Sequence, residues 1–240
     1  MQGNTLSKAL DIPRGVSAFV GGGGKTTLIM ELAEELSSKY KVLVTASAKM
    51  RKPKCKTLIA PSAREVLSAF EKTNLLALGS QEAEDKLGRL AELEPIYPVL
   101  ADCVLTEADG AHNLPLKAPA EHEPVIPREA ALVVAVLGLD GIGKPISQAC
   151  HRPEIYAKAA GAEILDIITP EMAASVLMSE AGQRKGVSCR FAAVLNKADN
   201  AERLESAREI ARRLNCTVLI TALKGEKKLL ETWRDGVCSY

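Results

Sequence analysis

A run of four glycines followed by a lysine and two threonines has residue types and spacing that suit phosphate binding. It lies within SAFVGGGGKTTLIM, from Ser17 to Met30. Glycines permit positive φ angles and close backbone approach, and their successive N–H groups then form a nest for an anion. A helix that starts here adds its positive N-terminal end. The residues expected to hold a nucleotide are Gly21, Gly22, Gly23, Gly24, Lys25, Thr26 and Thr27.

Lys25 and Thr26 have distinct expected roles in this loop. We expect Lys25 to be exposed, to reach the β- and γ-phosphates and to act in catalysis, while Thr26 places its hydroxyl on Mg²⁺. The strict P-loop pattern demands a glycine five positions before Gly24, where this chain has Phe19. The alternative is a mobile turn with a solvated lysine. The apolar run before the loop and the amphipathic pattern after it favour the phosphate loop.

Two carboxylates follow an apolar run in VLTEADGA. The two-residue period of a strand places Leu105, Glu107 and Asp109 on one face. Buried carboxylates are costly unless a cation or hydrogen bonds satisfy them, and Mg²⁺ bound to a nucleotide would do so. We predict Asp109 as the Mg²⁺ partner and Glu107 as a catalytic group that orients water, with the reverse assignment left open. The alternative is that both cap the next turn, because Asp-Gly is a common turn dipeptide.

A third motif, N-K-A-D, ends the run RFAAVLNKADN and comprises Asn196, Lys197 and Asp199. It resembles the N-K-x-D signature of GTP-binding proteins, in which the aspartate accepts from guanine, the lysine stem covers the ring and the asparagine braces the loop. Adenine presents an acceptor at that edge, so the motif favours GTP over ATP. The segment ITALKG at residues 220–225 resembles the loop that backs guanine in those proteins. The alternative is that Asn196 and Asp199 cap the following helix.

The segments that position these motifs alternate between apolar runs and helical patterns. Nearly continuous apolar runs predict buried parallel strands at residues 15–20, 41–47, 103–109, 131–139, 190–196 and 217–223. Apolar residues at helical spacing predict helices at 25–39, 61–72, from 170 onward and at 201–214. This alternation predicts an α/β fold: a doubly wound, mostly parallel sheet flanked by helices, with ligands beyond the carboxyl ends of the strands.

Length and composition favour one domain that spans residues 1–240, since a chain with 47% hydrophobic residues can bury a full core. A net charge of +1 gives no field to hold nucleic acid or an anionic membrane, so neither is an expected partner. The longest apolar stretch is half of what a membrane span needs. Six cysteines without a C-x-x-C pair argue against a disulfide framework and a zinc site, which favours a cytoplasmic location.

The chain as a whole resembles the YqeC family. The resemblance rests on VGGGGKTTL, LVTASAKM, LTEADGAHNLPLKAPAEHEPVIP, VLGLDGIGKP, CHRPE and VLNKAD, which occur in this order. It implies a P-loop NTPase α/β fold and a maturation factor that serves a selenium-dependent molybdenum hydroxylase or its cofactor. The family often has T-T-T-K-I-F-P-P after its second strand, whereas this chain reads TASAKMRKPK, with Arg51 in place of the aromatic.

Further polar residues in or beside these family-like stretches are candidates for contact with an acceptor substrate. They are Lys49, His112, Lys117, His122, Lys144, His151 and Arg152. The histidines lack the spacing of a metal site, so we prefer polar contacts to metal ligation, and surface histidines without a role are favoured over both. Cys150, next to His151, suits a selenium or sulfur carrier, but a buried, inert thiol is the favoured interpretation. An irregular segment as long as residues 110–127 is usually a functional loop, a disordered stretch or a sign of a missed helix or strand.

Three functions fit these residues. The first is a Mg²⁺-dependent enzyme that hydrolyses a nucleoside triphosphate, GTP rather than ATP, with the 110–127 loop closed over an acceptor. The second is a nucleotide-gated protein without turnover, which changes conformation to dock a hydroxylase apoprotein. The third is an ATP-dependent ligase or kinase, because the glycine, lysine and threonine pattern also begins such ATP loops. Turnover separates the first two functions, and nucleotide preference separates the third.

Overall fold

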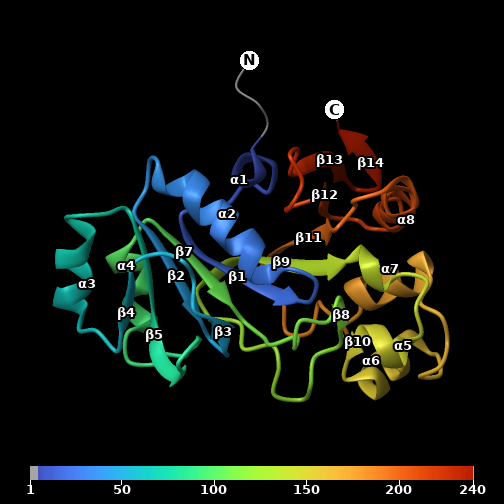
Figure 1. The fold of residues 1–240 in the computed structure, drawn as a ribbon, viewed down its shortest axis with the longest axis horizontal. Helices are drawn as coiled ribbons and strands as arrows, with labels where there is room; N and C mark the ends of the chain where they lie inside the picture. The colour runs from blue at the N-terminus through green and yellow to red at the C-terminus, as the bar shows by residue number, and fades with distance from the viewer. Residues whose placement is uncertain (1–4, 240) are drawn as a thin grey trace.

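A computed structural model describes residues 5–239, which form a 12-stranded mixed sheet with helices on both faces (Figure 1). Its central strands lie in the order β12-β11-β9-β1-β7-β2-β5, and all of these neighbours pair in parallel. The strands are β1 (Gly15–Gly21), β2 (Val42–Ala46), β5 (Leu75–Ala83), β7 (Cys103–Glu107), β9 (Ala130–Gly138), β11 (Arg190–Asn196) and β12 (Thr217–Thr221). The predicted doubly wound, mostly parallel sheet is confirmed.

Shorter strands complete the two edges of the sheet. β13 (Leu229–Arg234) and β14 (Val237–Ser239) extend it antiparallel beyond β12, while β6 (Lys86–Gly88) and β3 (Met50–Arg51) do so beyond β5. β4 (Thr57–Ile59) pairs in parallel with β5. A separate two-stranded parallel sheet joins β8 (Leu116–Lys117) to β10 (Cys150–His151). This small sheet brings the predicted 110–127 loop against Cys150 and His151.

The helices divide between the two faces because side chains alternate along each strand. On β1, Phe19 packs in the cluster that contains Leu28 and Leu32 of α2, whereas Ala18 and Val20 face the cluster around Tyr156. α1 (Leu6–Ala9) and α2 (Lys25–Ser37) cover the first face. The helices that cover the other face are α3 (Ala63–Phe70), α4 (Tyr97–Leu100), α5 (Ile146–Ala149), α6 (Pro153–Ala160), α7 (Pro170–Met178) and α8 (Ala201–Ala211), with short 3₁₀ turns η1 (Glu94–Ile96) and η2 (Leu139–Gly141).

Each of the six predicted strands and four predicted helices is present within a few residues of its expected bounds. The start of α3 is fixed by a capping box, in which Ser62 and Glu65 bond reciprocally. The sequence did not predict β5, whose second half is exposed and polar, or the short edge strands. Over residues 5–239, no helix is both long and apolar enough to span a membrane.

Candidate functional site

The glycine-rich segment, residues 21–27, connects β1 to α2 and is called here the glycine loop. Its glycines are packed so tightly that a side chain does not fit. A Cβ atom on Gly22 would lie 2.6 Å from the carbonyl oxygen of Leu114, and one on Gly23 would lie 2.2 Å from the nitrogen of Gly138. Gly23 also has a φ of 77°. The glycines therefore let the loop sit directly on the 110–127 loop and on the end of β9.

The N–H groups of the glycine loop fall into two sets. Gly21 donates to Asp109 Oδ2 (3.0 Å), Gly22 to the carbonyl of Val136 (2.9 Å) and Gly23 to that of Leu114 (3.1 Å). Among the described residues, none accepts from the N–H groups of residues 24–27, which open the 13-residue helix α2. The unpaired donors available to an anion thus lie at the helix N-terminus, whereas the first three glycines of the predicted nest donate their N–H groups to other parts of the protein.

Lys25 is buried, which corrects the expectation that it is exposed. Its side chain is 4% exposed, and its Nζ donates to the carbonyl of Gly21 at 2.6 Å. Nζ also lies 3.1 Å from Asp109 Oδ1 and 3.7 Å from Glu107 Oε1. Burial alone lowers the pKa of Lys25, but the carboxylates of Asp109 and Glu107 more than offset it and raise the pKa above its ordinary value. The lysine is held charged between two carboxylates.

The two carboxylates beyond β7 converge on Lys25, but they differ in their other partners. Glu107 accepts from the Thr26 hydroxyl at 2.7 Å. Asp109 has no exposed surface and contacts Lys117 Nζ (3.2 Å) as well as the Gly21 N–H. Burial raises the pKa of Glu107, although Lys25 and Thr26 lower it in part. The geometry therefore favours Glu107, rather than Asp109, as the carboxylate beside the Thr26 hydroxyl, which is the exchanged assignment.

Phe19 explains why the strict P-loop spacing fails here. It is a residue of β1, paired in register with Glu107 of β7, and its ring is fully buried in the cluster beneath α2. Its side chain points into this core, so it does not obstruct the loop that begins two residues later. A large residue is tolerated at this position because it belongs to the strand.

Asn196, at the end of β11, connects the glycine loop to the segment after β12. Its Nδ2 donates to the carbonyl of Gly23 at 2.8 Å. Its Oδ1 accepts from the Thr221 hydroxyl and from the N–H of Leu223, both at 3.2 Å. Asn196 is 4% exposed, and a Cβ on Gly24 would lie 2.5 Å from its amide nitrogen. One buried side chain thus holds the loop against two strand ends.

We expect Asn196→Ala to lower the free energy of unfolding by about 2–4 kcal/mol, because it leaves a buried carbonyl and a buried N–H without partners. Urea denaturation measures this loss. Thr221→Val is the matched control, since it removes one of the same hydrogen bonds while Asn196 stays in place, and we expect it to cost about 1 kcal/mol. Equal losses for the two variants would contradict the bracing role of Asn196.

The other two residues of the N-K-A-D motif are more open. Lys197 has a φ of 69° and forms an ion pair with Asp140 at 2.8 Å. Asp199 is exposed and pairs with Arg203 at 3.3 Å. The cap of α8 is Asn200, whose side chain accepts from the N–H of Arg203. The alternative in which Asn196 and Asp199 cap this helix is therefore wrong.

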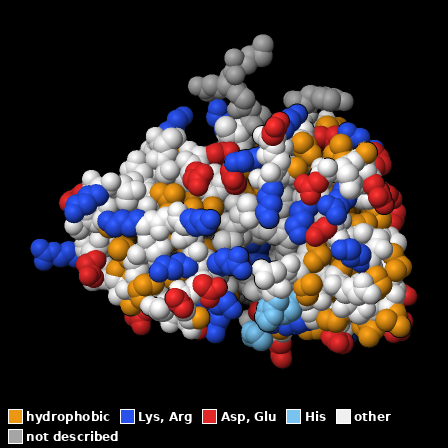
Figure 2. Space-filling model, viewed as in Figure 1, with side chains coloured by type: hydrophobic (Ala, Val, Ile, Leu, Met, Phe, Trp, Pro, Cys, Tyr) orange, Lys and Arg blue, Asp and Glu red, His pale blue; other side chains and the backbone are white. Residues whose placement is uncertain are grey.

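Four of the seven acceptor-site candidates lie together, and three do not join them. The imidazoles of His112 and His151 stack with their centroids 4.4 Å apart. Arg152 follows His151 in the chain, and both Arg152 and Lys117 form ion pairs with Glu123. Figure 2 shows histidine side chains gathered below a hollow at which Lys and Arg side chains meet. Exposed positions outside this cluster are occupied by Lys49, which pairs with Glu82, and by His122 and Lys144.

Glu123 is a residue that sequence reasoning missed. It accepts from Lys117 and from Arg152, and it is 9% exposed. Burial raises its pKa, but hydrogen bonds from Arg152 and Lys117 outweigh burial and lower the pKa to about 2. Its signal in the sequence was weak, because one glutamate in a polar loop is usually solvated. The location of Lys117 also corrects its expected role, since a fully buried side chain does not meet a substrate directly.

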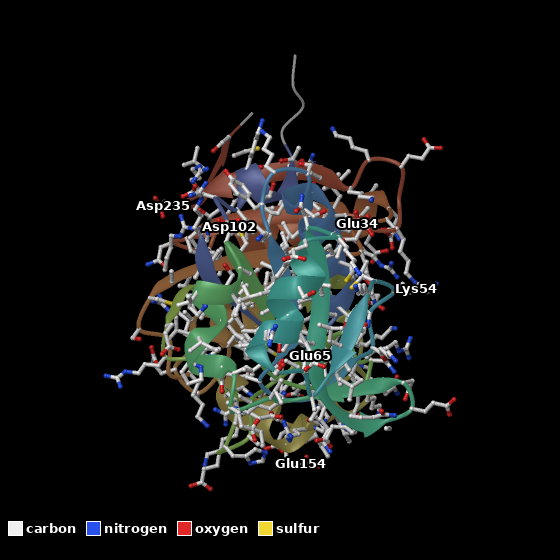
Figure 3. All side chains as sticks on the ribbon, turned by 90° about the vertical axis from the view of Figure 1, so that its left-hand side faces the viewer. Glu34, Lys54, Glu65, Asp102, Glu154 and Asp235 are labelled. Carbon is white, nitrogen blue, oxygen red and sulfur yellow. The ribbon has the colours of Figure 1, made fainter. Side chains whose placement is uncertain are left out.

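Two further sequence features have no role at this site. Cys150 lies in the hydrophobic core, where burial raises the pKa of its thiol to about 12, so the favoured interpretation as an inert thiol agrees with its location. The basic run of Lys49, Arg51, Lys52, Lys54 and Lys56 consists of exposed side chains. Lys54 points outward from the edge of the molecule in Figure 3. This run has the exposure of an ordinary solvated loop.

Comparison with known proteins places these features in a family. The model of the YqeC protein family matches residues 17–154 of this chain. The chain belongs to the YqeC family. A YqeC protein of Escherichia coli strain K12, described as uncharacterised, is 32% identical over 155 residues, which span 61% of this chain and 60% of that protein. A GTPase from Pyrococcus abyssi, solved in its apo form, aligns with a TM-score of 0.42 and 16% identity over 89% of this chain and 92% of that chain.

The region that matches the YqeC family contains most of the residues described above. It includes the glycine loop, both carboxylates and the buried ion pairs as far as Arg152. Asn196 and Asp199 lie beyond it. The family match therefore does not extend to the N-K-A-D motif.

Proposed function

We propose that this protein binds a Mg²⁺–nucleoside triphosphate at the glycine loop. The observation that carries the proposal is the set of unpaired N–H groups at residues 24–27, which open α2 beside the Lys25 ammonium and the Thr26 hydroxyl. Aligned N–H groups at a helix N-terminus attract phosphate, and a lysine supplies the opposing charge. The glycines, Asn196 and the end of β9 hold this set of groups in place.

Phosphate binding requires Lys25 to exchange partners. In the described structure the ammonium is satisfied by Asp109, Glu107 and the carbonyl of Gly21. A triphosphate carries more negative charge than these carboxylates, and the Lys25 stem stands in the first turn of α2, among the residues whose N–H groups are unpaired. We infer that Lys25 turns from the carboxylates to the phosphates, and that this exchange is the first conformational consequence of binding.

The residues beside Lys25 fit a magnesium ion. Thr26 and Glu107 present a hydroxyl and a carboxylate whose oxygens are 2.7 Å apart, and oxygen ligands are those that Mg²⁺ prefers. When bound, the ion would neutralise charge on the phosphates. Glu107 would hold it directly or through water, and Asp109 would keep the Gly21 N–H and Lys25 in position.

GTP is the proposed nucleotide. Asn196 links the glycine loop to the segment after β12, and Asp199 stands exposed three residues later, which supports a guanine pocket of the N-K-x-D kind. A carboxylate there accepts from the N1–H and 2-amino groups of guanine and repels the N1 acceptor of adenine. Lys197 would cover the base with its stem.

The proposed biological output is maturation of a selenium-dependent molybdenum hydroxylase, with hydrolysis of the nucleotide in the cytoplasm. This part rests on the YqeC family resemblance. The alternative outputs are nucleotide-gated docking of the hydroxylase apoprotein without turnover, and ATP-dependent ligation or phosphorylation of an acceptor. Thermal melting with GTP, ATP and Mg²⁺ tests the binding step, since a ligand at 100 times its Kd adds about 2.7 kcal/mol of stability. An unchanged melting temperature with both nucleotides would contradict the proposal.

We expect Glu107→Gln to weaken Mg²⁺-dependent triphosphate binding by about tenfold or more, because one charge-assisted ligand of the ion is lost. Binding without Mg²⁺ should not weaken, since the Glu107 carboxylate repels phosphate when no metal ion lies between them. Asp109→Asn is the matched variant. It should weaken binding equally with and without Mg²⁺, because Asp109 holds the loop and Lys25 rather than the metal. Isothermal titration with and without EDTA measures both, and a Mg²⁺-specific loss for Asp109→Asn alone would reverse the two roles.

A further inference from the structure

Buried ion pairs form a continuous series from the glycine loop to the histidine pair, and it is called here the ion-pair chain. Its members alternate in sign along the series Glu107, Lys25, Asp109, Lys117, Glu123 and Arg152. The distances from lysine Nζ to carboxylate oxygen are 3.7 Å for Lys25–Glu107, 3.1 Å for Lys25–Asp109, 3.2 Å for Lys117–Asp109 and 2.6 Å for Lys117–Glu123. Arg152 donates from its two terminal guanidinium nitrogens to the two carboxylate oxygens of Glu123. Three cations and three anions make the chain neutral as a whole.

Lys117 occupies the middle of the ion-pair chain. Its side chain is completely buried, and Nζ contacts Asp109 Oδ2, Glu123 Oε2 and the carbonyl of Gly110, the last at 2.5 Å. A buried ammonium is stabilised only while both carboxylates remain close, and removal of one partner from such a set is costly. The position of Lys117 therefore depends on the charge that each neighbour presents.

The outer end of the chain contacts solvent at the histidines. Arg152 adopts a left-handed φ of 64°, and the neighbouring His151 stacks on His112, which is exposed and has a φ of 50°. Burial lowers the pKa of His151, the positive charges of Arg152, His112 and Lys117 lower it further, and the carboxylate of Glu123 raises it in part. Left-handed residues that are not glycine are strained, and they are held in place by their surroundings.

We propose that Lys117 is a positioning residue, the counter-ion that keeps Asp109 satisfied when Lys25 turns to phosphate, and that the ion-pair chain thereby couples the glycine loop to the histidine pair. The inference rests on the proposed nucleotide binding at this loop. Departure of Lys25 leaves Lys117 as the one lysine beside Asp109, at a starting distance of 3.2 Å. Lys117 then shifts toward Asp109 and weakens its pair with Glu123.

The expected change at the histidines has a definite sign. As Lys117 withdraws, Glu123 is less neutralised and the positive potential at His151 falls. The pKa of His151 should therefore rise when the loop is occupied. In Lys117→Met, Lys25 is the only lysine that pairs with Asp109, so the movement of Lys25 to the phosphates leaves a buried carboxylate without a counter-ion. This variant should therefore bind triphosphate about tenfold more weakly than the parent.

Proton NMR of the histidine C2–H resonances tests the coupling. The chain has three histidines, so a His151→Asn variant identifies which of the resonances belongs to His151. With saturating Mg²⁺–GTP, the pKa of His151 should rise. Glu123→Gln interrupts the chain beyond Asp109, so this variant should bind GTP within about twofold of the parent and lose the rise at His151. A rise that persists in Glu123→Gln, or one that is absent from a GTP-bound parent, overturns the coupling.

A second arm needs no nucleotide and separates the inference from the proposed function. Lys25→Met imitates the departure of Lys25, so the pKa of His151 should rise in this variant. In a Lys117→Met background the same change should have no effect. Lys185→Met is the matched control, because Lys185 donates to the carbonyls of Ala120 and Glu121 in the same loop and does not contact Asp109. It should retain the GTP response. Equal His151 shifts for Lys25→Met with and without Lys117 overturn the role of Lys117, whether or not GTP binds.

Discussion

Lys25→Met is expected to abolish the stabilisation by triphosphate and to lower the free energy of unfolding by about 3–5 kcal/mol at pH 7. The first effect follows because the ammonium opposes the phosphate charge. The second follows because Lys25 is 4% exposed and lies between Asp109 and Glu107, so its removal leaves buried carboxylates without their shared cation. A solvated lysine in a mobile turn would show neither effect.

The pH dependence of the Lys25→Met variant provides an independent check. Burial already raises the pKa of Glu107, and loss of Lys25 removes an influence that lowers it. A buried carboxyl with a raised pKa binds its proton more tightly in the folded state than in the unfolded state. Stability therefore falls as pH rises through the range between the unfolded and folded pKa values. The stability deficit of the variant should be smaller at pH 5 than at pH 8, as measured by urea denaturation.

The double variant Lys25→Met/Glu107→Gln distinguishes stability from binding. It removes one positive and one negative charge, and Asp109 keeps Lys117 as its partner. We expect most of the lost stability to return, while triphosphate binding stays absent because no lysine reaches the phosphates. Restored binding in the double variant would show that Glu107, once unpaired, was the obstacle and that Lys25 is not a phosphate ligand.

The sequence predicted the site best where local patterns determine structure. Nearly continuous apolar runs identified the buried central strands, and the period of a strand placed Glu107 and Asp109 together. Ligands are expected beyond the carboxyl ends of parallel strands, and the glycine loop, this carboxylate pair and Asn196 all lie at such ends. Asn196 indeed bonds to the glycine loop across 173 residues of sequence. These are consequences of sheet geometry, which a single sequence encodes strongly.

Charge pairing over long distances was the part that the sequence did not reveal. Glu123 and Arg152 are 29 residues apart, and Lys117 joins the same network from a two-residue strand. Lone charged residues in polar segments are usually solvated, so nothing local distinguished these from the exposed Lys49 or Lys144. The burial of Lys25 was missed for the same reason, since it depends on carboxylates from another strand.

Asp199→Asn is expected to reverse nucleotide preference from GTP to xanthosine triphosphate. The carboxylate accepts from the N1–H and 2-amino groups of guanine, and its loss should cost about 1.5–3 kcal/mol, or roughly 10- to 150-fold in GTP affinity. Xanthine has a carbonyl in place of the amine, to which the new amide donates. Stability should change by less than about 1 kcal/mol, because the ion pair with Arg203 is exposed.

Asn200→Ala is the control that the structure supplies for this prediction. Asn200 accepts from the N–H of Arg203 and caps α8, so its loss should cost about 1 kcal/mol of stability without any change in nucleotide ranking. Competition binding with GTP, ATP and xanthosine triphosphate measures the ranking for the parent and both variants. If Asp199→Asn keeps the parental order, Asp199 does not contact the base. If Asn200→Ala changes that order as well, the effect arises from the start of α8 rather than from the carboxylate. A reversal confined to Asp199→Asn would place guanine at the end of β11, beside the asparagine that holds the glycine loop.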